Sequence, residues 1–472
     1  MIVRSIRRVT NDARHNAFTG CCWFKGNLYV AYRQGDAHVC EFGRIVVLRS
    51  RDGGLSWDHV AVLRGPDDTR DAHLYSDGKR LYAVGFVYEK KGKPDCYSGC
   101  SYTNDGDLWT PWRRYAGTGR AVMWRPQFFR GIHYCAGYVF DLKPSRQKKR
   151  EAVNWYESRD GLGWKPVRTL HSGSDEPNEC SLEIRPDGRA TMLMRCESRG
   201  RNPYLCTSRY PFRKWKMQKL RDVSIGGPCV WTVGDQVYLG ARWRLLEQDH
   251  HTAHTAIFKV VKGKTKLQCV LPSGPGFDHS YMALARYPDN DCRFVASFYS
   301  DAVAPSDLRV GQWDHPDIYL ADLLFEAEYL RDGFFVSKRI TIPSGLKDAP
   351  CPDPRDASLQ FTRAKAGVAG YPDFLNVTNA TEKKPGIIYI VRDIEIVGAD
   401  RVRVHVGYDG PVKVWWNGQE VFQGSGTNPA MKDQTTLVAK ARDGTNRLVI
   451  ALDTNGGKAE GIFARWERVA AR

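Results

Sequence analysis

Residues 49–60, RSRDGGLSWDHV, place an acidic side chain beside two glycines and two hydroxyl groups, a composition that could bind a cation. A calcium loop needs several oxygen ligands in alternation along the chain. Between Ser50 and Trp57 the only acidic residue is Asp52. This segment is therefore not expected to bind calcium, and the sequence predicts neither a metal nor another cofactor.

The cysteines are a second group whose chemistry depends on spacing. The chain has thirteen, spread from Cys21 to Cys351, and no two of them form a CxxC pair. A zinc site needs closer pairing than this. We interpret them as scattered buried thiols in a reducing compartment.

The pattern of residues 50–57 recurs at a regular spacing. TNDGDLW (103–109) and SRDGLGW (158–164) repeat it, and SRYPFRKW (208–215) keeps its serine and tryptophan. The tryptophans stand at 57, 109, 164 and 215, so the steps are 52, 55 and 51 residues. A period near fifty residues with several strands in each unit indicates a β-propeller.

Most other segments also predict strands. Apolar and polar residues alternate in NLYVAYR, RLYAVGFVY and QVYLGARW, while amphipathic helices are scarce. The proline-rich segment 343–358 marks a boundary. The sequence thus predicts an all-β protein with a six-bladed propeller at 1–345, a linker at 346–358 and a β-sandwich at 359–472. The fifth and sixth units lack the tryptophan, which leaves seven blades open.

The formal net charge of +17 raises the question of an acidic partner. The one dense basic run, KPSRQKKR at 143–150, has no nucleic-acid-binding motif beside it, so we expect an acidic glycan instead. No apolar run is long enough to span a membrane, and the start of the chain lacks the apolar region of a signal peptide. A cytoplasmic protein is expected, or a secreted or periplasmic one if a leader has been removed; the oligomeric state stays open.

SRDGGLSW resembles the Asp box of sialidases and related propellers. The resemblance implies a hairpin turn at the blade periphery that joins the outer two strands, with its tryptophan packed between blades. Such boxes also occur in proteins of other function, so the motif bears on the fold more than on the activity.

The resemblance also implies a set of catalytic groups. Sialidase substrates carry a carboxylate on the anomeric carbon, which would repel a carboxylate nucleophile, so the family uses tyrosine activated by glutamate. An aspartic acid serves as general acid and base, and three arginines hold the substrate carboxylate. The matching residues here are the nucleophile Tyr281, its base Glu179, the acid Asp71, and the carboxylate-binding Arg14, Arg195 and Arg242.

These matches differ in strength. Glu179 and Arg195, sixteen residues apart across a PDG turn, are the most specific, although they also suit a structural ion pair between adjacent strands. Arg14 is followed by His-Asn, where the family has Ile-Pro. His38 stands where the family often has a carboxylate. Further residues that could line the pocket are Arg33, His38, Trp124, Arg125, His133 and Tyr138.

Three functions remain open at this point. The first is an exo-acting, sialidase-like glycoside hydrolase that releases a terminal α-linked acidic sugar with retention. The second is a propeller polysaccharide lyase, or a glycosidase acting on uronate-containing glycans, with His133, Tyr138 and Arg195 as the agents of a lyase. The third is a non-catalytic glycan-binding propeller.

The C-terminal segment VKVWWNGQEVF resembles a hairpin of the jelly-roll domains that are appended to glycosidases. Trp415 and Trp416 alternate along a strand, so one ring is expected in the core and the other exposed for stacking on a sugar. A carbohydrate-binding accessory domain and a purely structural one are both consistent with this pattern.

Overall fold

A computed structural model of the chain describes residues 1–89, 95–139, 151–198, 200–244, 253–272, 281–288, 290–301, 315–325, 330, 332–367, 373–377, 384–396, 400–426 and 429–469. The basic run at 143–150 lies outside these residues. The described residues form strands and three-residue 3₁₀ turns, and none of their helices has the length and apolarity to cross a bilayer. The chain divides into two units, one of Val3–Tyr287 with Arg293–Leu323, the other of Leu324–Arg472 with two short pieces.

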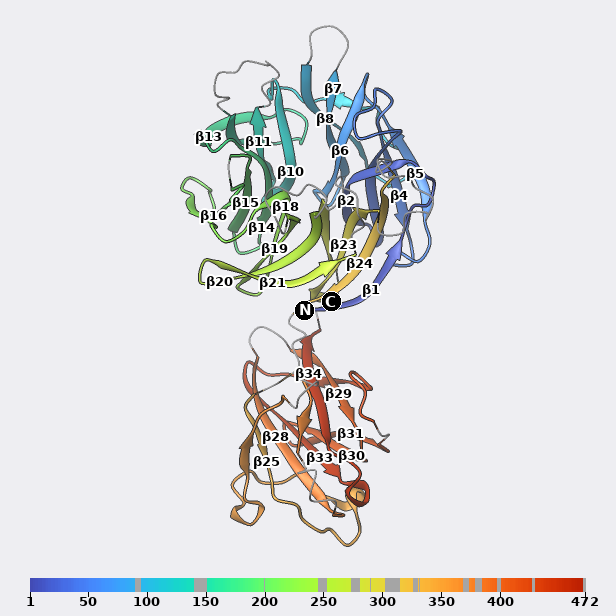
Figure 1. Cartoon of the computed structure of the whole chain (residues 1–472), viewed down its shortest axis with the longest axis vertical. Helices are drawn as coiled ribbons and strands as arrows, with labels where there is room; N and C mark the ends of the chain where they lie inside the picture. Colours follow the sequence, from blue (N-terminus) through green and yellow to red (C-terminus); the bar gives the residue numbers. More distant parts are fainter. Residues whose placement is uncertain are drawn as a thin grey trace. The chain divides into compact units, whose positions relative to one another are not determined.

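The first unit contains six four-stranded sheets in the described part of the chain, each a blade (Figure 1). Blade one contains β2 (His15–Phe24), β3 (Asn27–Gly35), β4 (Arg44–Ser50) and β5 (Asp58–Leu63). Blade two contains β6 (Asp68–Ser76), β7 (Leu81–Glu89), β8 (Asp95–Thr103) and β9 (Arg113–Arg114). Blade three contains β10 (Ala121–Phe129), β11 (Ile132–Val139), β12 (Glu151–Ser158) and β13 (Lys165–Gly173).

The remaining three blades follow the same order. Blade four contains β14 (Pro177–Ile184), β15 (Arg189–Cys196), β16 (Tyr204–Arg209) and β17 (Lys216–Lys219). Blade five contains β18 (Ile225–Val233), β19 (Gln236–Arg244), β20 (Ala253–Val261) and β21 (Lys264–Leu271). Blade six contains β22 (Met282–Tyr287), β23 (Asn290–Ser300), β24 (Asp317–Leu324) and, as its outer strand, β1 (Ile2–Arg8).

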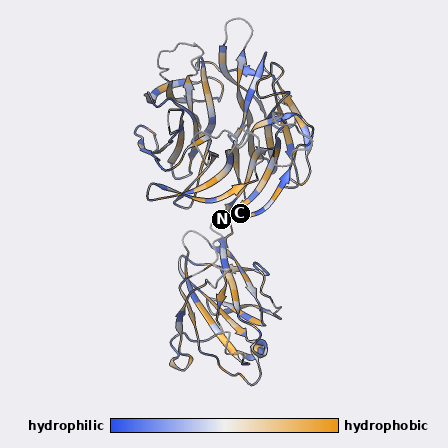
Figure 2. Ribbon diagram, in the orientation of Figure 1, coloured by the Kyte–Doolittle hydropathy of each residue, from blue (hydrophilic) through white to orange (hydrophobic). Residues whose placement is uncertain are grey.

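The inner strands close the blades into a ring. Each contacts the inner strand of the next blade, in the order β2, β6, β10, β14, β18, β22 and back to β2. All nine residues of β18 are buried, whereas the outer strand β13 begins with five exposed residues. Figure 2 shows hydrophobic stretches, in orange, along many of the strands. The predicted six-bladed propeller is confirmed, and the seven-bladed alternative is not found among the described residues.

Blade six joins two distant parts of the chain. β1 pairs with β24, and Val9 N donates to the carbonyl oxygen of Ile318 at 2.7 Å (Figure 1). The Arg8 guanidinium contacts the Asp317 carboxylate, with Nε 2.9 Å from Oδ2, and Thr10 Oγ1 donates to Asp317 Oδ1 at 3.0 Å. These contacts fasten the ring at its closing blade.

Three Asp–Gly turns join the outer two strands of blades one, two and three. In the first, Ser50 Oγ lies 2.7 Å from Asp52 Oδ1, and this oxygen accepts the amides of Leu55 and Ser56 at 2.9 Å. Asp105 and Asp160 each accept two amides at 2.9 Å in the equivalent turns. The aspartates therefore bind backbone amides of their own hairpins.

Each turn also lies against the preceding blade. Gly106 has φ +95°, and a side chain there would collide with the Tyr29 hydroxyl of blade one. Arg49 of blade one donates to Asp107 in the same turn at 2.6 Å. Tyr82 of blade two donates to the carbonyl oxygen of Asp160 at 3.3 Å. The recurring motif is thus part of the contact between blades.

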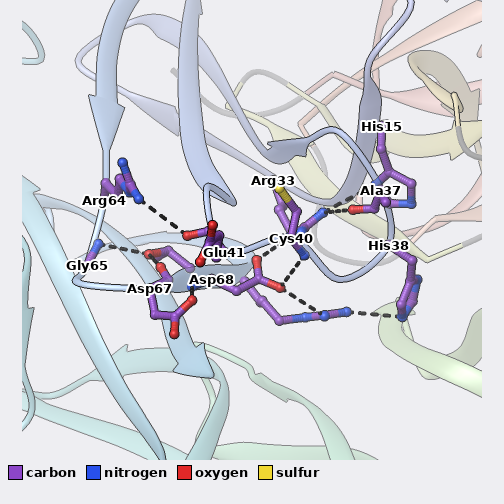
Figure 3. A network of polar contacts seen from close by, with 12 residues as sticks. His15, Arg33, Ala37, His38, Cys40, Glu41, Arg64, Gly65, Asp67 and Asp68 are labelled. Carbon is purple, nitrogen blue, oxygen red and sulfur yellow. Dashed lines mark hydrogen bonds and ion pairs between the residues drawn. The ribbon is translucent and has the colours of Figure 1, made fainter. Parts of the chain in front are cut away.

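Blades one and two are joined by a buried charge network (Figure 3). Arg33 Nε on β3 lies 2.8 Å from Asp68 Oδ1 on β6, and both side chains are 0% exposed. Asp68 Oδ2 also accepts Arg70 Nη1 and the amide of Cys40, both at 3.2 Å. Arg70 Nη2 lies 3.1 Å from His38 Nε2. The network fixes the loop between β3 and β4 against blade two.

The second unit is a sandwich of two antiparallel sheets. One has the order β26-β25-β28-β33-β30-β31, the other β27-β34-β29-β32. Residues of both sheets, such as Ile390, Val404 and Ile450, form one core. Its elements are β25 (Phe334–Val336), η2 (Leu346–Asp348), η3 (Ala357–Leu359), β26 (Thr362–Ala364), β27 (Leu375–Asn376), β28 (Ile387–Ile396), β29 (Arg401–Tyr408), β30 (Val412–Trp416), β31 (Gln419–Gly424), β32 (Thr435–Lys440), β33 (Gly444–Asp453), η4 (Asn455–Gly457) and β34 (Gly461–Arg468).

The segment around the predicted boundary packs onto this sandwich. β25 lies before residue 345 and pairs with β28, so the second unit begins earlier in the chain than the sequence indicated. Within and just after the expected linker, Leu346 and Leu359 are buried in a cluster with Trp415. Apolar residues of this proline-rich segment thus pack against the sheet that contains β28, β30 and β33.

The prediction of one exposed tryptophan ring is wrong. Trp415 is 4% exposed and Trp416 is 3% exposed. Trp416 lies in the core between the sheets and donates from Nε1 to the carbonyl oxygen of Lys440 at 2.8 Å. Both faces of β30 are covered, so neither ring is available for stacking on a sugar.

The Arg33–Asp68 pair gives a stability prediction. Asp68→Asn leaves two arginines without their shared carboxylate, one of them fully buried, and we expect a loss of about 3–5 kcal/mol. Thermal or denaturant unfolding followed by near-UV circular dichroism measures it. Asp235→Asn, which removes an exposed ion pair with Arg189, is the control and should leave the unfolding midpoint unchanged. Equal effects of the two substitutions would contradict a structural role for the network.

Candidate active site

A tyrosine, a glutamate and an arginine from blades four and six meet in one cluster. The Tyr281 hydroxyl, just before β22, donates to Glu179 Oε1 at 2.8 Å and accepts from Arg195 Nη1 at 2.9 Å. Arg195 Nη1 is also 2.7 Å from Glu179 Oε2. Tyr281 and Glu179 are 6% and 7% exposed. The phenol thus lies between a base that can take its proton and a cation that stabilises negative charge.

Glu179 reaches this position because its strand is irregular. A shift of register separates Pro177 from Cys180 in β14, and such bulges redirect side chains. The inner strands of four other blades carry the same irregularity at equivalent positions. These shifts lie between Ala17 and Gly20, Arg70 and His73, Trp124 and Gln127, and Gly226 and Cys229.

The bulges place further side chains at the same level of the ring. Phe18, Asp71 and Arg125 have φ values of +52°, +57° and +51°, in the left-handed region that non-glycine residues rarely adopt. Phe18 packs edge-on against Tyr281, with ring centroids 5.6 Å apart. Strained residues of this kind cluster at functional sites. Five blades thus present their bulged residues around one position.

Gly227 makes room for the tyrosine. It occupies the bulge of β18 with φ +54°, and a side chain there would collide with the Tyr281 ring. Its amide donates to Glu179 Oε2 at 3.1 Å. Sequence reasoning missed Gly227, although a glycine pair within a strand signals close approach of another group.

Charge and burial set the protonation of the cluster. Burial raises the pKa of the Tyr281 hydroxyl above its ordinary value, and the Glu179 charge raises it further, while Arg195 and Arg242 oppose this. The phenol is therefore protonated in the free protein and needs Glu179 to take its proton. Burial also raises the pKa of Asp71 to about 7; Arg70 opposes this, and Glu179 adds to it.

Arg242 on β19 contacts the other side of the tyrosine. Its guanidinium carbon is 4.6 Å from the centroid of the Tyr281 ring, and Nη2 donates to the Tyr299 hydroxyl on β23 at 3.1 Å. Arg195 and Arg242 thus approach Tyr281 from adjacent blades. Tyr299 was not among the sequence-predicted residues.

Several predicted pocket residues lie near this cluster. Trp124 is edge-on to Tyr281 at 6.1 Å, and Arg125 donates to the carbonyl oxygen of Met282. His38 is edge-on to Phe18 at 5.5 Å. Burial raises the pKa of Tyr138, and the charges of Glu179 and Asp71 raise it further, which places this phenol within reach of their field.

Three predicted residues are not joined to Tyr281 by any contact among the described residues. The Arg14 side chain is 48% exposed and pairs with Asp36 at 3.4 Å. Arg33 is enclosed in the network with Asp68. His133 Nδ1 lies 3.2 Å from the Tyr75 hydroxyl, and its ring packs on Tyr82 between blades two and three.

Arg70 was also missed. Its guanidinium carbon lies 5.1 Å from the centroid of the Phe18 ring, and it contacts His38. It directly precedes Asp71 in the sequence, within the bulged segment of β6. In an ideal strand, consecutive side chains point to opposite faces, whereas a bulge can turn them toward one region. The strand pattern therefore did not indicate that Arg70 lies near Phe18.

No protein-family model matches the chain, and no curated protein matches it. Among solved structures, a Dyadobacter fermentans protein of unknown function is 16% identical with a TM-score of 0.53, covering 68% of this chain and 100% of that one. Phage phi92 endosialidase is 9% identical with a TM-score of 0.50, covering 82% and 85%. Trypanosoma rangeli sialidase is 9% identical with a TM-score of 0.47, covering 98% and 92%. At such identities a likeness establishes the fold alone: the first unit has a sialidase-like β-propeller fold.

Proposed function

We propose that the protein is an exo-acting glycoside hydrolase that releases a terminal α-linked acidic sugar of the sialic acid type with retention. The observation that supports this most is the Tyr281 hydroxyl held between Glu179 and Arg195. A neutral phenol can approach an anomeric carbon that carries a carboxylate, where a carboxylate nucleophile would be repelled. The Asp–Gly turns resemble the Asp boxes of sialidases, which bear on the fold more than on the activity.

The first chemical step uses three side chains. The Tyr281 oxygen attacks the anomeric carbon while Glu179 takes the phenolic proton. The bond to the leaving oxygen breaks, and Asp71 donates its proton to that oxygen. Arg195 and Arg242 hold the substrate carboxylate through charge-assisted hydrogen bonds. The product of this step is a sugar bound covalently to Tyr281.

The second step reverses these roles. Water attacks the anomeric carbon, and the ionised Asp71 takes its proton. The Tyr281 oxygen leaves and regains its proton from Glu179. Two inversions at the same carbon give net retention. The buried position of the phenol favours the neutral form at the end of each cycle.

Product analysis distinguishes this function from its alternatives. A hydrolase frees a keto acid from an aryl sialoside, whereas a lyase acting on a uronate produces an unsaturated sugar that absorbs ultraviolet light. A binding propeller gives neither product. His133, an agent expected for a lyase, is enclosed between blades two and three, which favours the hydrolase.

Tyr281→Phe tests the nucleophile. We expect the rate on an aryl sialoside to fall by about 1,000-fold or more, because the attacking oxygen is removed while the ring remains. A 2,3-difluoro derivative of the sugar, whose fluorines slow the second step, should add its sugar mass to the wild-type protein and not to the variant. Tyr287→Phe, at the end of the strand β22 that follows Tyr281, is the matched control. Undiminished turnover in Tyr281→Phe would refute the assignment.

The raised pKa of Asp71 predicts a pH dependence. Asp71 must be protonated in the first step, so kcat/KM should fall as the pH rises through about 7, where the carboxyl group of the free protein ionises. Asp71→Asn should remove this dependence and lower the rate about 100- to 10,000-fold on an alkyl glycoside. The loss should be much smaller on an aryl glycoside, whose phenolate leaves without a proton. Equal losses on the two substrates would exclude Asp71 as the acid.

A further inference from the structure

Arg125 reaches across the axis of the propeller to the strand that follows the tyrosine. It lies on β10 of blade three, and its guanidinium donates to the carbonyl oxygen of Met282, the first residue of β22 in blade six. The inner strands follow one another in the order β2, β6, β10, β14, β18 and β22, so blades three and six face each other across the ring. This hydrogen bond therefore spans the centre of the ring, and it ends one residue after Tyr281.

Two other buried residues also place the guanidinium near the axis. Burial lowers the pKa of His73, on β6 of blade two, and the charge of Arg125 lowers it further. Burial raises the pKa of the Cys229 thiol, on β18 of blade five, and Arg125 opposes this through its charge and a hydrogen bond. Blades two and five also face each other, so a side chain that acts on residues of both lies between them.

The backbone of Arg125 is strained at this point. Its φ is +51°, and it precedes Pro126, whose ring restricts the conformation of the residue before it. In a regular strand Trp124 and Arg125 would point to opposite faces. In the bulge of β10, Trp124 packs edge-on against Tyr281 and Arg125 bonds to the carbonyl of Met282. Both residues of the bulge thus contact the segment that carries the proposed nucleophile.

Met282 is held from a second direction. Its side chain is fully buried, and its sulfur lies so close to Gly240 of β19 that a side chain at this glycine would collide with it. Met282 therefore packs on blade five while its carbonyl oxygen is bonded to blade three. A displacement of the neighbouring Tyr281 backbone has to disturb one of these two contacts.

The contacts of the Tyr281 oxygen change during the proposed reaction. In the free protein this hydroxyl donates to Glu179. Once the oxygen is bonded to the sugar it carries no proton, so that hydrogen bond is absent for the lifetime of the intermediate. The bond from Arg125 to Met282 involves no reacting atom, and it is therefore present in both chemical steps.

We propose that Arg125 is a positioning residue, which holds the backbone of Tyr281 from across the ring so that the phenol oxygen keeps its place through both steps. In this role Arg125 makes no contact with the sugar, unlike the pocket-lining role expected from the sequence. The inference rests on the proposed function for its chemical consequence, but the tether itself predicts a local rigidity that is measurable without any substrate.

Arg125→Met tests the tether, because it removes the guanidinium and keeps a long unbranched side chain. Arg168→Met is the matched control, since Arg168 also donates to a backbone carbonyl, that of Arg213, but in an exposed contact. Amide hydrogen exchange of the full-length proteins, followed by mass spectrometry, measures the opening of residues 281–287. We expect exchange there to rise about 10-fold or more in Arg125→Met and to stay at the wild-type rate in the control.

Kinetics and binding separate positioning from a general structural role. On an aryl sialoside, kcat of Arg125→Met should fall by about 10- to 100-fold, because a small misplacement of a reacting atom is costly. The dissociation constant of N-acetylneuraminic acid, measured by calorimetry, should stay within about twofold of wild type, since Arg125 does not touch the sugar. A residue that only stabilises the fold would weaken binding and catalysis together.

Arg125→Lys keeps the test decisive if Arg125→Met folds poorly. Lysine retains the charge and a donor but not the planar fork, so this variant should lose less of the rate and show an intermediate rate of exchange.

The outcomes distinguish this inference from the proposed function. Wild-type exchange at residues 281–287 in Arg125→Met overturns the tether, whatever the activity. Faster exchange with an unchanged kcat overturns the positioning role and leaves the hydrolase assignment intact, and weaker binding of the acid makes Arg125 a binding residue instead. If the wild-type protein hydrolyses no sialoside, the proposed function fails, while faster exchange confined to residues 281–287 still supports the tether.

Discussion

The buried contact among Glu179, Arg195 and Tyr281 is the interaction on which the rest of the site depends. A lone carboxylate or guanidinium would be costly to remove from water, but here each charge is hydrogen-bonded by the others. The Tyr281 hydroxyl forms one hydrogen bond with Glu179 and one with Arg195, and these two bonds fix the position of its oxygen. The same geometry that makes burial tolerable also prepares the oxygen for attack.

The propeller supplies what this contact requires. No single sheet carries all three residues; Glu179 and Arg195 come from blade four, and Tyr281 from blade six. The ring of inner strands brings these blades to a common centre, and the bulges turn side chains toward it. Strain at Phe18, Asp71 and Arg125 is sustained by the packed blades on either side.

The sequence was informative where a local pattern carried the signal. The tryptophan spacing predicted the blades, and the separation of Glu179 from Arg195 across a turn predicted partners on adjacent strands. Contacts between residues far apart in the sequence were harder to predict, because no local pattern indicates them. Bulges break strand alternation without a residue pattern of their own, so Arg70 and Gly227 were missed. Exposure of one tryptophan ring was predicted wrongly because the segment that covers Trp415 has the composition of a linker.

The pairing of β1 with β24 has a consequence for how the chain folds. Arg8 and Asp317 are 309 positions apart, whereas the strands of the other five blades pair with strands that are next to them in chain order. On the ribosome, blades one to five can form in order as they emerge, but the ring stays open until β24 has been synthesised. Contacts of such long range are slow to form, and an open propeller exposes the faces of its first and last blades, which pack on each other in the closed ring. Productive folding then depends on completing blade six before those faces meet another chain.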